Sequence, residues 1–572
     1  MDDKERSYQE KIERRIALEK SRKNLKNKKA LPKLKIFNKT DIQKEIENRM
    51  QAVSDEDILA YLDENTQGDA KLYQYLHNDF VIYVKFWNRF LIWAGNHWAE
   101  DDTNLQYSYI ENVCKCYQRV ADNKKELLDR EQNKTKNEEK EKNKEVQFAL
   151  QKIIDSVERR IKLLRTPRGG ENVLTMVQRI ESPMMCLPKQ IDKHYYKLAC
   201  PNGVIDIRTG DITPGNPKDL LLKSCITPYN KDLLELEDPC PETSAFLLRS
   251  MDGNQELVNF IWRILGYGII RDRKDHIFTI FWGEHGRNGK DTLIKLITKV
   301  LGLDLSGDIP VEMFLQTTQV RNSSAPSPDI LALRGMCIGW VNEAEEGQRF
   351  ALAKLKKLTG GGYITARGLQ DKEQTTWLQT HLPIMTTNEL PKAKADDAAF
   401  WQRTIIVKWL LSFVDNPTEP YQRQADKKLD QKLEKEAEGV LVRLIQGAMD
   451  YLQNGLNIPE KVQEWTSGQR MQWDDIAQFI EECCNVEAYQ ENPNDYKMKT
   501  PASDLHEYFV IWYAKNKDNR EKAQISSKLF SQLLDKKNIP SIRSNGTKRL
   551  GISLKFDCQK ELENHRDSKN VY

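Results

Sequence analysis

One segment, HIFTIFWGEHGRNGKDTLIKLITKVLG from His276 to Gly302, constrains the fold of this 572-residue chain more than any other. It opens with an apolar, β-forming run, Ile277 to Trp282, passes through a glycine-rich loop, and ends in an amphipathic helix expected from Thr292. Backbone N–H groups of such a loop and the N-terminus of the following helix can converge on an anion. The segment therefore predicts a strand, a phosphate-binding loop and a helix within an α/β domain.

The loop also supplies side chains suited to a nucleoside triphosphate. Lys290 is expected to reach the β and γ phosphates as a mobile point charge. The predicted ATP-binding residues are Gly283, Glu284, His285, Gly286, Arg287, Asn288, Gly289, Lys290, Asp291 and Thr292.

The spacing departs from G-x-x-x-x-G-K-[ST]. Gly283 lies six residues before Gly289, and Asp291 stands where a hydroxyl normally holds Mg²⁺. Either Thr292 or Asp291 is then expected to contribute to the metal site. Taken alone, the loop is equally compatible with a tight turn before a helix.

A second apolar segment, LRGMCIGWVNEAEE from Leu333 to Glu346, ends in acidic residues. A rigid strand of this kind can place a carboxylate beside Mg²⁺ and the attacking water. Glu343 is the first choice for that carboxylate and Glu345 the second, with Asn342 assisting. A strand that simply ends in a polar turn is the alternative.

Two further strands carry polar residues at their ends. LPIMTTNELP places Asn388 after an apolar run, where an amide can orient water against the γ phosphate. FWQRTIIVKW places Arg403 just before another run, where it could reach the nucleotide of a neighbouring subunit as an arginine finger. Taken singly, Arg403 is also compatible with an ordinary ion pair.

Between these motifs lies a predicted hairpin. Gly360 to Gly362 should end a helix, and YITAR and QTTWL alternate as two strands around GLQDKE. Arg367 and Lys372 give the hairpin a cationic tip. Such a tip is how a ring could hold a phosphate backbone in its pore.

The motifs GRNGK, WVNEAEE, KKLTGGGYITAR, MTTNELP and FWQR, in this order, resemble those of the superfamily 3 helicases. The resemblance is specifically to the C-terminal helicase region of phage and plasmid primases, which is related to the poxvirus primase-helicase. Upstream, GDAKLYQYL, GNHW, NGVIDIRTGDITP and ILGYGI resemble the collar-like region that precedes this motor. The similarity spans roughly Asp55 to Leu411.

This resemblance implies an AAA+ P-loop ATPase core, with a parallel sheet and flanking helices, that uses ATP and Mg²⁺. Members are usually hexameric and translocate 3′ to 5′ on single-stranded DNA. Matching positions make Lys290 the phosphate lysine, Glu343 the Walker B acid, Asn388 the sensor, Arg403 the finger, and Lys357, Arg367 and Lys372 contacts to DNA. The implied partners are single-stranded and forked DNA, further copies of the chain, and a separate primase or polymerase.

The chain is long enough for roughly three or four domains, α/β and α in class. The expected organisation is a charged basic arm (1–54), a collar-like helical or α+β region (55–270) with a charged insertion (122–146), the ATPase core (271–420), a helical lid (421–462), a winged-helix-like domain (463–558) and a tail (559–572).

Within the collar-like region, the aromatic stretch from Tyr83 to Trp98 predicts a buried helical core, with base stacking as the alternative. The charged stretch from Asp122 to Glu145 predicts either a surface helix extension or a disordered insertion. Asn202 to Pro214 predicts a hairpin around an Arg-Thr-Gly turn.

The C-terminal segment predicts two helices followed by a basic hairpin. Ser526 or Ser527 is expected to cap the second helix. The strands around an Asn545-Gly546 turn carry Arg543, Lys548 and Arg549. This order is typical of a winged helix, whose wing could contact DNA or serve as a structural cap.

The net charge of only +3 means that any DNA-binding surface is expected to be local. The basic run from Lys20 to Lys35 is either a solvated helix or an arm that touches phosphates. Cysteine spacing shows no metal pattern, and neither a signal peptide nor a bilayer-spanning run is apparent. These features favour a soluble cytoplasmic protein, in a bacterial cell or the cytoplasm of a host.

We expect a stand-alone replicative helicase of a phage, plasmid or mobile element. The alternatives are a primase or primase-helicase subunit, and a non-translocating AAA+ ATPase that remodels nucleic acid or acts in defence.

Overall fold

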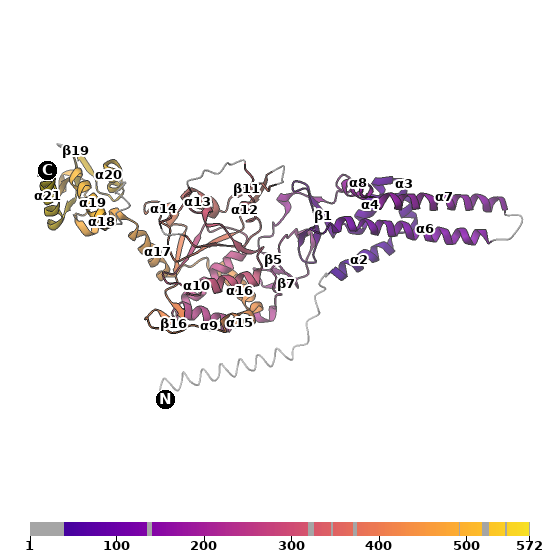
Figure 1. Cartoon of the computed structure of the whole chain (residues 1–572), viewed down its shortest axis with the longest axis horizontal. Coiled ribbons are helices and arrows are strands. Elements are labelled where there is room, and N and C mark those ends of the chain that lie inside the picture. Colours follow the sequence, from indigo (N-terminus) through magenta and orange to yellow (C-terminus); the bar gives the residue numbers. More distant parts are fainter. Residues whose placement is uncertain are drawn as a thin grey trace, which may run out of the picture. The chain divides into compact units, whose positions relative to one another are not determined.

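The computed structural model describes residues 39–133, 140–317, 325–344, 347–369, 374–490, 492–516, 526–543 and 546–570. The chain divides into two compact units, Met1–Lys231 and Asp232–Tyr572 (Figure 1). The basic run from Lys20 to Lys35 lies outside the described residues.

The first unit contains a helical subdomain. Its helices are α2 (Lys39–Ala52), α3 (Asp55–Asp63), α4 (Asn65–His77), α5 (Leu105–Ser108), α6 (Ile110–Gln132), α7 (Lys140–Leu164) and α8 (Pro167–Met176). They surround a core that includes the fully buried Tyr73, Tyr117 and Val157. Helix α2 belongs to this unit because Ile42 and Ile46 are buried, so the end of the predicted basic arm is a packed helix.

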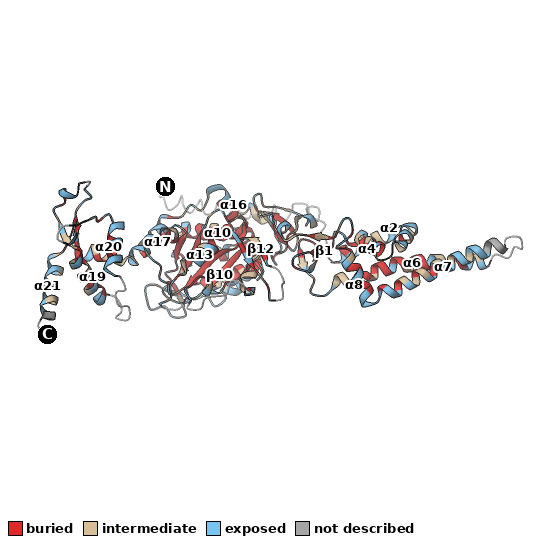
Figure 2. Ribbon diagram, turned by 90° about the horizontal axis from the view of Figure 1, so that it is seen from above, coloured by how far each residue is buried: buried red, intermediate tan, exposed pale blue. Residues whose placement is uncertain are grey.

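The predicted charged insertion forms the ends of two helices. α6 and α7 lie side by side (Figures 1 and 2), with buried residues concentrated away from their connection. The helix-extension interpretation is therefore confirmed for the described part of 122–146, and residues 134–139 lie outside it. An amphipathic stripe explains the pairing, since Val113, Tyr117 and Val120 repeat at helical spacing and are all fully buried.

The aromatic stretch from Tyr83 to Trp98 is buried as predicted, but the prediction that it is helical was wrong. It forms strands β1 (Val81–Val84), β2 (Arg89–Trp93) and β3 (Trp98–Glu100), which continue through β4 (Met185–Cys186) in the order β3-β2-β1-β4. Asn88 takes the left-handed conformation (φ 52°) in the turn between β1 and β2. The tight turn lets Tyr83 and Phe90 pair across the strands, which a helix could not do.

A second, three-stranded antiparallel sheet completes the first unit. It consists of β5 (Lys197–Cys200), β6 (Gly203–Asp206) and β7 (Asp211–Thr213). Val204 pairs with Thr213, which confirms the hairpin predicted around the Arg-Thr-Gly turn.

The second unit is built on a five-stranded parallel sheet in the order β14-β8-β13-β10-β9. All four strand pairings are parallel. The strands are β8 (Phe278–Trp282), β9 (Ser306–Asp308), β10 (Ile338–Asn342), β13 (Leu382–Thr387) and β14 (Thr404–Lys408). Apart from the short β9 (Ser-Gly-Asp), they are largely apolar because helices cover both faces (Figure 2).

The helices of the second unit flank this sheet. α13 (Leu352–Thr359) and α14 (Ala398–Trp401) contribute to one apolar cluster with the sheet. α9 (Pro241–Ser250), α10 (Gln255–Ile269), α15 (Leu429–Glu434) and α16 (Ala437–Asn454) lie on the other side (Figure 1), and α11 (Lys290–Leu301) packs on α16. α10 packs along α16 and touches β10. The predicted collar boundary at residue 270 therefore lies too late, because α9 and α10 belong to the unit that contains the sheet.

Shorter elements complete the part between the sheet and the C-terminal segment. They are α12 (Pro328–Leu331), the hairpin strands β11 (Tyr363–Ala366) and β12 (Thr375–Leu378), the parallel pair β15 (Ser412–Val414) and β16 (Gln422–Gln424), and α17 (Glu460–Gln472), which packs on β14. Strands β11 and β12 pair antiparallel, as predicted. The tip, including Lys372, lies outside the described residues.

The C-terminal segment forms its own apolar core, which includes Phe479, Phe509 and Phe530. Its elements are α18 (Asp475–Cys483), β17 (Cys484–Val486), β18 (Lys499–Pro501), α19 (Ala502–Asn516), α20 (Ser527–Lys536), β19 (Ser541–Arg543), β20 (Thr547–Leu550), β21 (Ile552–Leu554) and α21 (Phe556–Asn570).

The predicted helix, helix and hairpin are present in that segment. The Ser526 hydroxyl accepts a hydrogen bond from the Leu529 N–H (3.3 Å), which is one of the two caps expected for α20. The predicted tail is instead a helix. Leu562 of α21 is buried in the core, and the Tyr508 hydroxyl donates to the Glu561 carboxylate (2.9 Å).

Candidate functional site

A cavity of about 310 Å³ lies where four parallel strands end, and we call it the carboxyl-edge cavity. The loops after the carboxyl ends of parallel strands are the usual place for ligand sites in α/β sheets. The cavity is lined by Gly286, Arg287, Asn288, Lys290, Asp291, Ile294, Lys295, Asp308, Asn342, Glu343, Thr386, Thr387 and Asn388. The topology thus brings Lys290, Glu343 and Asn388, predicted from separate motifs, to one site.

The glycine-rich loop is held by neighbouring backbone. The Ser412 hydroxyl donates to the Gly286 carbonyl and the Phe413 N–H to the Arg287 carbonyl, both at 2.8 Å. Gly289 has φ +94°, and a Cβ there would lie 2.9 Å from the Phe246 ring. Because both the backbone conformation and the space favour glycine, the turn into α11 depends on this residue.

Lys290, the first residue of α11, is buried with 5% of its surface exposed. Its Nζ donates to Asn388 Oδ1 (2.9 Å) and to the Thr387 carbonyl (3.0 Å). Burial lowers the pKa of Lys290 to about 8, although the negative charges of Asp291 and Glu343 act in the opposite direction. The ammonium group is therefore directed into the cavity and hydrogen-bonded to neutral oxygens only.

Glu343 follows directly after β10 and takes the left-handed conformation, with φ +39°. Its N–H donates to the Thr386 carbonyl (3.0 Å) on the adjacent strand. Non-glycine residues in this region are strained and are often found at functional sites. The exposed Glu343 side chain lines the cavity, while Glu345 lies outside the described residues.

The neighbouring polar side chains form a network at the ends of β9, β10 and β13. The Asn342 amide donates to Asp308 Oδ1 (3.1 Å), and the Thr386 hydroxyl donates to Asn342 Oδ1 (3.0 Å). Sequence reasoning missed Asp308. Its only signal was an acidic residue at the end of a three-residue strand, too short to stand out in the sequence.

The carboxylates suit a Mg²⁺ ion that is shared with phosphate oxygens. Magnesium is usually bound through one or two protein carboxylates, with substrate oxygens and waters completing its shell. Asp291 and Glu343 line the cavity, whereas Thr292 is not among the lining residues. Helix α11 begins at Lys290 rather than at Thr292, so Asp291 lies in its first turn. Within the described part of the chain, no group of three or more His, Cys, Asp and Glu side chains could hold a metal alone.

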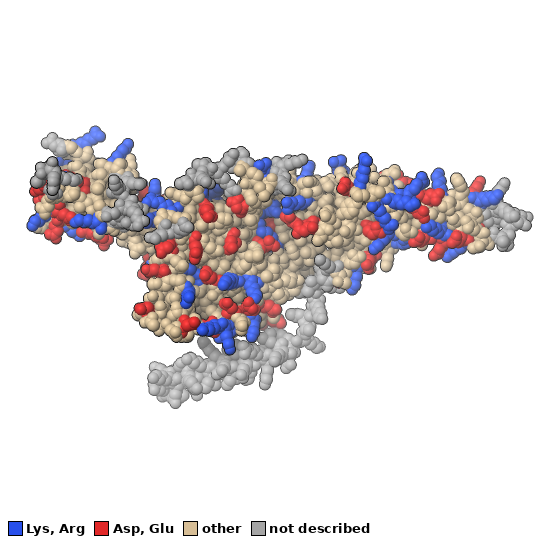
Figure 3. Space-filling model, viewed as in Figure 1, with Lys and Arg blue, Asp and Glu red and all other residues tan. Residues whose placement is uncertain are grey.

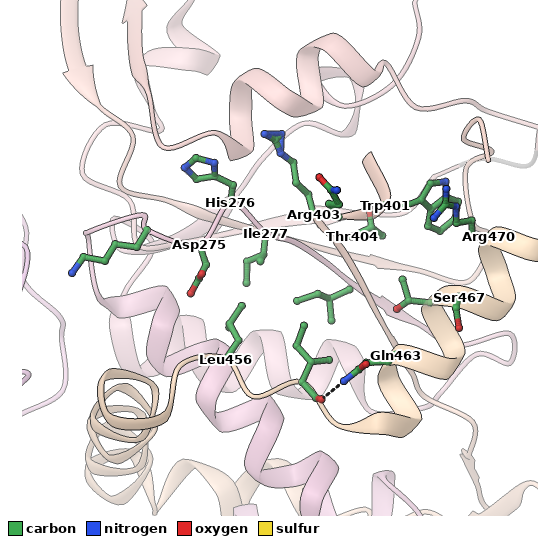
Figure 4. A pocket seen from close by; sticks show the side chains of 15 residues that line it. Asp275, His276, Ile277, Trp401, Arg403, Thr404, Leu456, Gln463, Ser467 and Arg470 are labelled. Atoms are coloured by element: carbon green, nitrogen blue, oxygen red, sulfur yellow. Dashed lines mark hydrogen bonds between the residues drawn. The ribbon is translucent and has the colours of Figure 1, made fainter. Parts of the chain in front are cut away.

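Arg403 lies away from this cavity. It precedes β14, whose first residue Thr404 pairs with Phe278 at the start of β8. Since each of these strands has five residues, Arg403 and the glycine-rich loop lie at opposite edges of the sheet, roughly 16 Å apart along the strands. It lines a separate cavity of about 590 Å³, the amino-edge cavity, shown in Figure 4.

The predicted DNA contacts differ in exposure. Lys357 is exposed in the last turn of α13, and Arg367 is half-buried after β11. On the C-terminal hairpin, Arg543 is exposed and Lys548 half-buried. On the face seen in Figure 3, acidic and basic side chains are interspersed.

The prediction that Arg549 contacts DNA was wrong. Its side chain is 1% exposed, pairs with Asp535, and donates to the carbonyls of Ile539 (2.8 Å) and Ser531 (2.6 Å). Strand alternation places Lys548 and Arg549 on opposite faces of β20, which the sequence of a basic turn could not reveal.

Comparisons with known proteins found a matching family, similar viral proteins and similar solved structures. A family described as "D5 N terminal like" matches residues 70–251. A mimivirus protein (Acanthamoeba polyphaga mimivirus) described as "Putative helicase" is 25% identical over 338 residues, 57% of this chain and 34% of that protein. A "Putative primase" of African swine fever virus is 24% identical over 250 residues, 41% of this chain and 24% of that protein. The chain is similar to viral proteins described as putative helicases and putative primases.

The chain spans about a third or less of the length of the curated relatives it matches. Among solved structures, the apo structure of the NrS-1 C-terminal region is 12% identical, with a TM-score of 0.36, and the likeness covers 67% of this chain and 89% of that one. The family match at residues 70–251 falls largely on the predicted collar-like region and crosses the boundary between the two units. Among the described residues of this chain, no helix is both long and apolar enough to span a membrane.

Proposed function

We propose that this chain is an ATP-driven DNA helicase, an AAA+ P-loop ATPase of superfamily 3 that works as a ring, usually a hexamer. The observation that carries the proposal is the convergence of Lys290, Glu343 and Asn388 on one cavity at the carboxyl edge of a parallel sheet. A lysine at the start of a helix, a carboxylate after one strand and an amide after the next are the groups that phosphoryl transfer requires.

In the proposed reaction Lys290 and Asn388 have one task each, and Glu343 has two. Lys290 exchanges its neutral acceptors, Asn388 Oδ1 and the Thr387 carbonyl, for oxygens of the β and γ phosphates. That exchange frees the Asn388 amide to orient the attacking water, and Glu343 accepts a proton from this water. Mg²⁺, held through Asp291 and Glu343, would neutralise phosphate charge when bound with the nucleotide.

The DNA-binding part of the proposal places single-stranded DNA along the β11–β12 hairpin. Lys357, Arg367 and Lys372 would contact phosphates there, while Arg543 and Lys548 could contact the duplex of a fork. Translocation 3′ to 5′ belongs to this proposal, as does replication of a phage, plasmid, virus or other mobile element. The names of the viral relatives support a role in DNA replication.

The central test compares hydrolysis and unwinding in matched variants. Lys290→Ala should reduce ATP hydrolysis by roughly 100-fold or more, since the main cation on the phosphates is lost. Glu343→Gln should still bind ATP but hydrolyse it slowly, because the shape is kept and the proton acceptor is lost. Lys299→Ala removes a lysine from the same helix, where it pairs with Glu434 outside the cavity, and should behave as wild type.

Unwinding of a 3′-tailed fork should fail in the Lys290→Ala and Glu343→Gln variants and persist in Lys299→Ala. Normal turnover in Lys290→Ala would exclude this cavity as the ATPase site. Hydrolysis without strand displacement in the wild type would instead favour a non-translocating ATPase.

A second candidate is a primase or primase-helicase subunit, favoured by the description of the African swine fever virus relatives. Primer synthesis on a single-stranded template, assayed with labelled ribonucleotides, separates the two. Primers made by this chain alone would add priming to the proposed function, whereas primers made only with an added polymerase would assign priming to a partner.

A further inference from the structure

The amino-edge cavity is lined from three parts of the second unit. Lys274, Asp275 and His276 precede β8, Trp401 and Arg403 precede β14, and Gln463 and Arg470 lie on α17. In Figure 4, His276 and Arg403 project from the starts of neighbouring strands, and Arg470 projects from α17 beside Trp401. The cavity is therefore assembled by the tertiary fold, since its walls lie far apart in the sequence.

Its charged lining is predominantly positive. Lys274 pairs with Asp272 (3.6 Å), which leaves Arg403 and Arg470 against one lining carboxylate, Asp275. That carboxylate already accepts a hydrogen bond from the Tyr451 hydroxyl (2.6 Å), and burial together with this bond raises the pKa of Tyr451. Asp275 is thus engaged with α16, and a net positive charge remains for a ligand.

Arg403 has an unused donor. Its backbone is fixed, because its carbonyl accepts from the Phe278 N–H (2.7 Å) and its N–H donates to the Phe400 carbonyl (3.0 Å). Its Nη1 is buried without a hydrogen-bond partner among the described residues. A buried donor left unpaired is costly and calls for an acceptor.

Arg470 is held by a hydrogen bond from its side chain rather than by its backbone. Its Nε donates to the Ala395 carbonyl (2.9 Å), a contact that fixes the guanidinium plane on the surface at the end of α17. In the described part of the chain, no carboxylate pairs with either Arg403 or Arg470 within ion-pair distance. Neither guanidinium group is neutralised by a carboxylate there, and guanidinium groups match phosphate oxygens with planar, bidentate geometry.

We propose that Arg470 acts with Arg403 as a pair of arginines that contact the γ phosphate of a nucleotide bound to the next copy of the chain. The inference rests on the proposed function, because it needs a triphosphate at the carboxyl-edge cavity. It adds a second residue, from outside the sheet and its motifs, to the single finger expected from the sequence.

Charge complementarity supports a nucleotide bound to the next copy of the chain as the ligand of the two arginines. The carboxyl-edge cavity is lined by three cations, Arg287, Lys290 and Lys295, and by three carboxylates, Asp291, Asp308 and Glu343, so its own side chains balance. A triphosphate with Mg²⁺ brings excess negative charge, which the amino edge of a second copy can neutralise. Contact between the opposite edges of two copies is heterologous, and such contacts form a ring when the rotation between copies closes.

The arginines take no part in bond making. In hydrolysis, the oxygen of a water molecule bonds to the γ phosphorus, the bond to the bridging oxygen breaks, and that oxygen leaves with ADP. The guanidinium groups keep their protons throughout and only stabilise the charge that develops on the transferred group.

The test uses the full chain with Arg470→Ala, Arg470→Gln and a matched control, Lys461→Ala. Lys461 lies on the same helix but stacks over Trp465 and does not line the cavity. Arg470→Ala should lower kcat by roughly 10- to 1000-fold while the ATP dissociation constant changes less than about threefold. Lys461→Ala should keep the wild-type kcat. Particle mass is measured for each variant, and if Arg470→Ala fails to assemble, Arg470→Gln is used in its place.

Mixing then separates action in trans from action in cis. Inactive Arg470→Ala mixed with inactive Lys290→Ala should regain activity, because mixed interfaces combine an intact Lys290 with an intact Arg470. A wild-type kcat in Arg470→Ala overturns the inference. The inference is also overturned if mixing with Lys290→Ala restores the activity of Arg403→Ala but not that of Arg470→Ala. Normal hydrolysis by Lys290→Ala alone would instead overturn the proposed ATPase site.

Discussion

At the scale of single residues, the environment of Lys290 sets the properties of the carboxyl-edge cavity. The lysine is buried among neutral oxygens, so its charged form lacks a counter-ion within hydrogen-bond distance. Burial disfavours that form and lowers its pKa to about 8, whereas an adjacent phosphate would favour it again. The same group should therefore couple phosphate binding to proton uptake.

This coupling predicts a pH dependence of ATP binding. Below about pH 8 Lys290 is already protonated, and above it ATP binding must take up a proton. The affinity should then fall by roughly tenfold between pH 7 and pH 9. Isothermal titration at pH 9 in buffers of different ionisation enthalpy should report the uptake of up to one proton per site. In Lys290→Arg, which stays charged, both the pH dependence and the proton uptake should disappear; their persistence would assign them to another group.

Arg549 leads to a prediction about stability. Its guanidinium bonds the Ile539 and Ser531 carbonyls and Asp535 from a buried position. Arg549→Ala should lower the free energy of unfolding of the C-terminal segment by roughly 2–3 kcal/mol, because two buried carbonyls lose their donor. Arg543→Ala, at an exposed position of the same hairpin, should stay within about 0.5 kcal/mol. Urea unfolding followed by tryptophan fluorescence can compare them, and equal values would contradict the structural role.

At the scale of elements, the base of the β11–β12 hairpin is fixed by one side chain. Gln379, 1% exposed, accepts from the Gly361 N–H (3.1 Å) and donates to the carbonyls of Leu358 and His381. It joins the end of α13 to the segment that leads into β13. Because β13 ends at the carboxyl-edge cavity, the hairpin base and Asn388 lie at the two ends of one strand.

We expect Gln379→Ala to loosen the hairpin. Three backbone groups would lose a buried partner, which should destabilise the protein by roughly 2–4 kcal/mol and reduce the stimulation of ATP hydrolysis by single-stranded DNA. The control is Thr376→Ala, on the exposed face of the same hairpin, which should change stability by less than about 1 kcal/mol. Thermal unfolding and DNA-stimulated turnover are the measurements. Full stimulation in Gln379→Ala would show that anchoring the base is not needed for coupling.

At the scale of the whole molecule, the sheet presents its two candidate sites at opposite edges. Lys290 lines one cavity and Arg403 the other, so a single copy cannot bring them together through the sheet. A ring of copies would allow Arg403 of one copy to approach the cavity that contains Lys290 in the next copy.

The corresponding prediction concerns assembly. In the presence of ATP and single-stranded DNA, the measured particle mass should be a whole-number multiple of the 66.6 kDa chain, with six copies expected. Arg403→Ala should assemble and bind ATP normally but hydrolyse it slowly, and mixing it with Lys290→Ala should restore part of the activity. A strictly monomeric particle with full hydrolysis would exclude a site shared between copies.

The sequence by itself determined the local elements around the site. Apolar, β-rich runs followed by polar residues placed Lys290, Glu343 and Asn388 at strand or helix ends, because a buried strand must stop where its polar residues begin. Glycines and alternating residues likewise predicted the β11–β12 hairpin. The aromatic stretch from Tyr83 to Trp98 was harder, since large apolar residues suit a buried helix and a buried strand equally, and only the strand partners decided.

Tertiary structure alone decided what those elements do together. The strand order set Asp308 beside Asn342, carried Arg403 to the edge opposite the glycine-rich loop, and brought Arg470 to the same cavity as Arg403. It also buried Arg549, although its neighbour Lys548 is half-exposed. These outcomes depend on contacts between residues distant in the chain, and no local pattern encodes which strands become neighbours or which side of a basic hairpin faces the core.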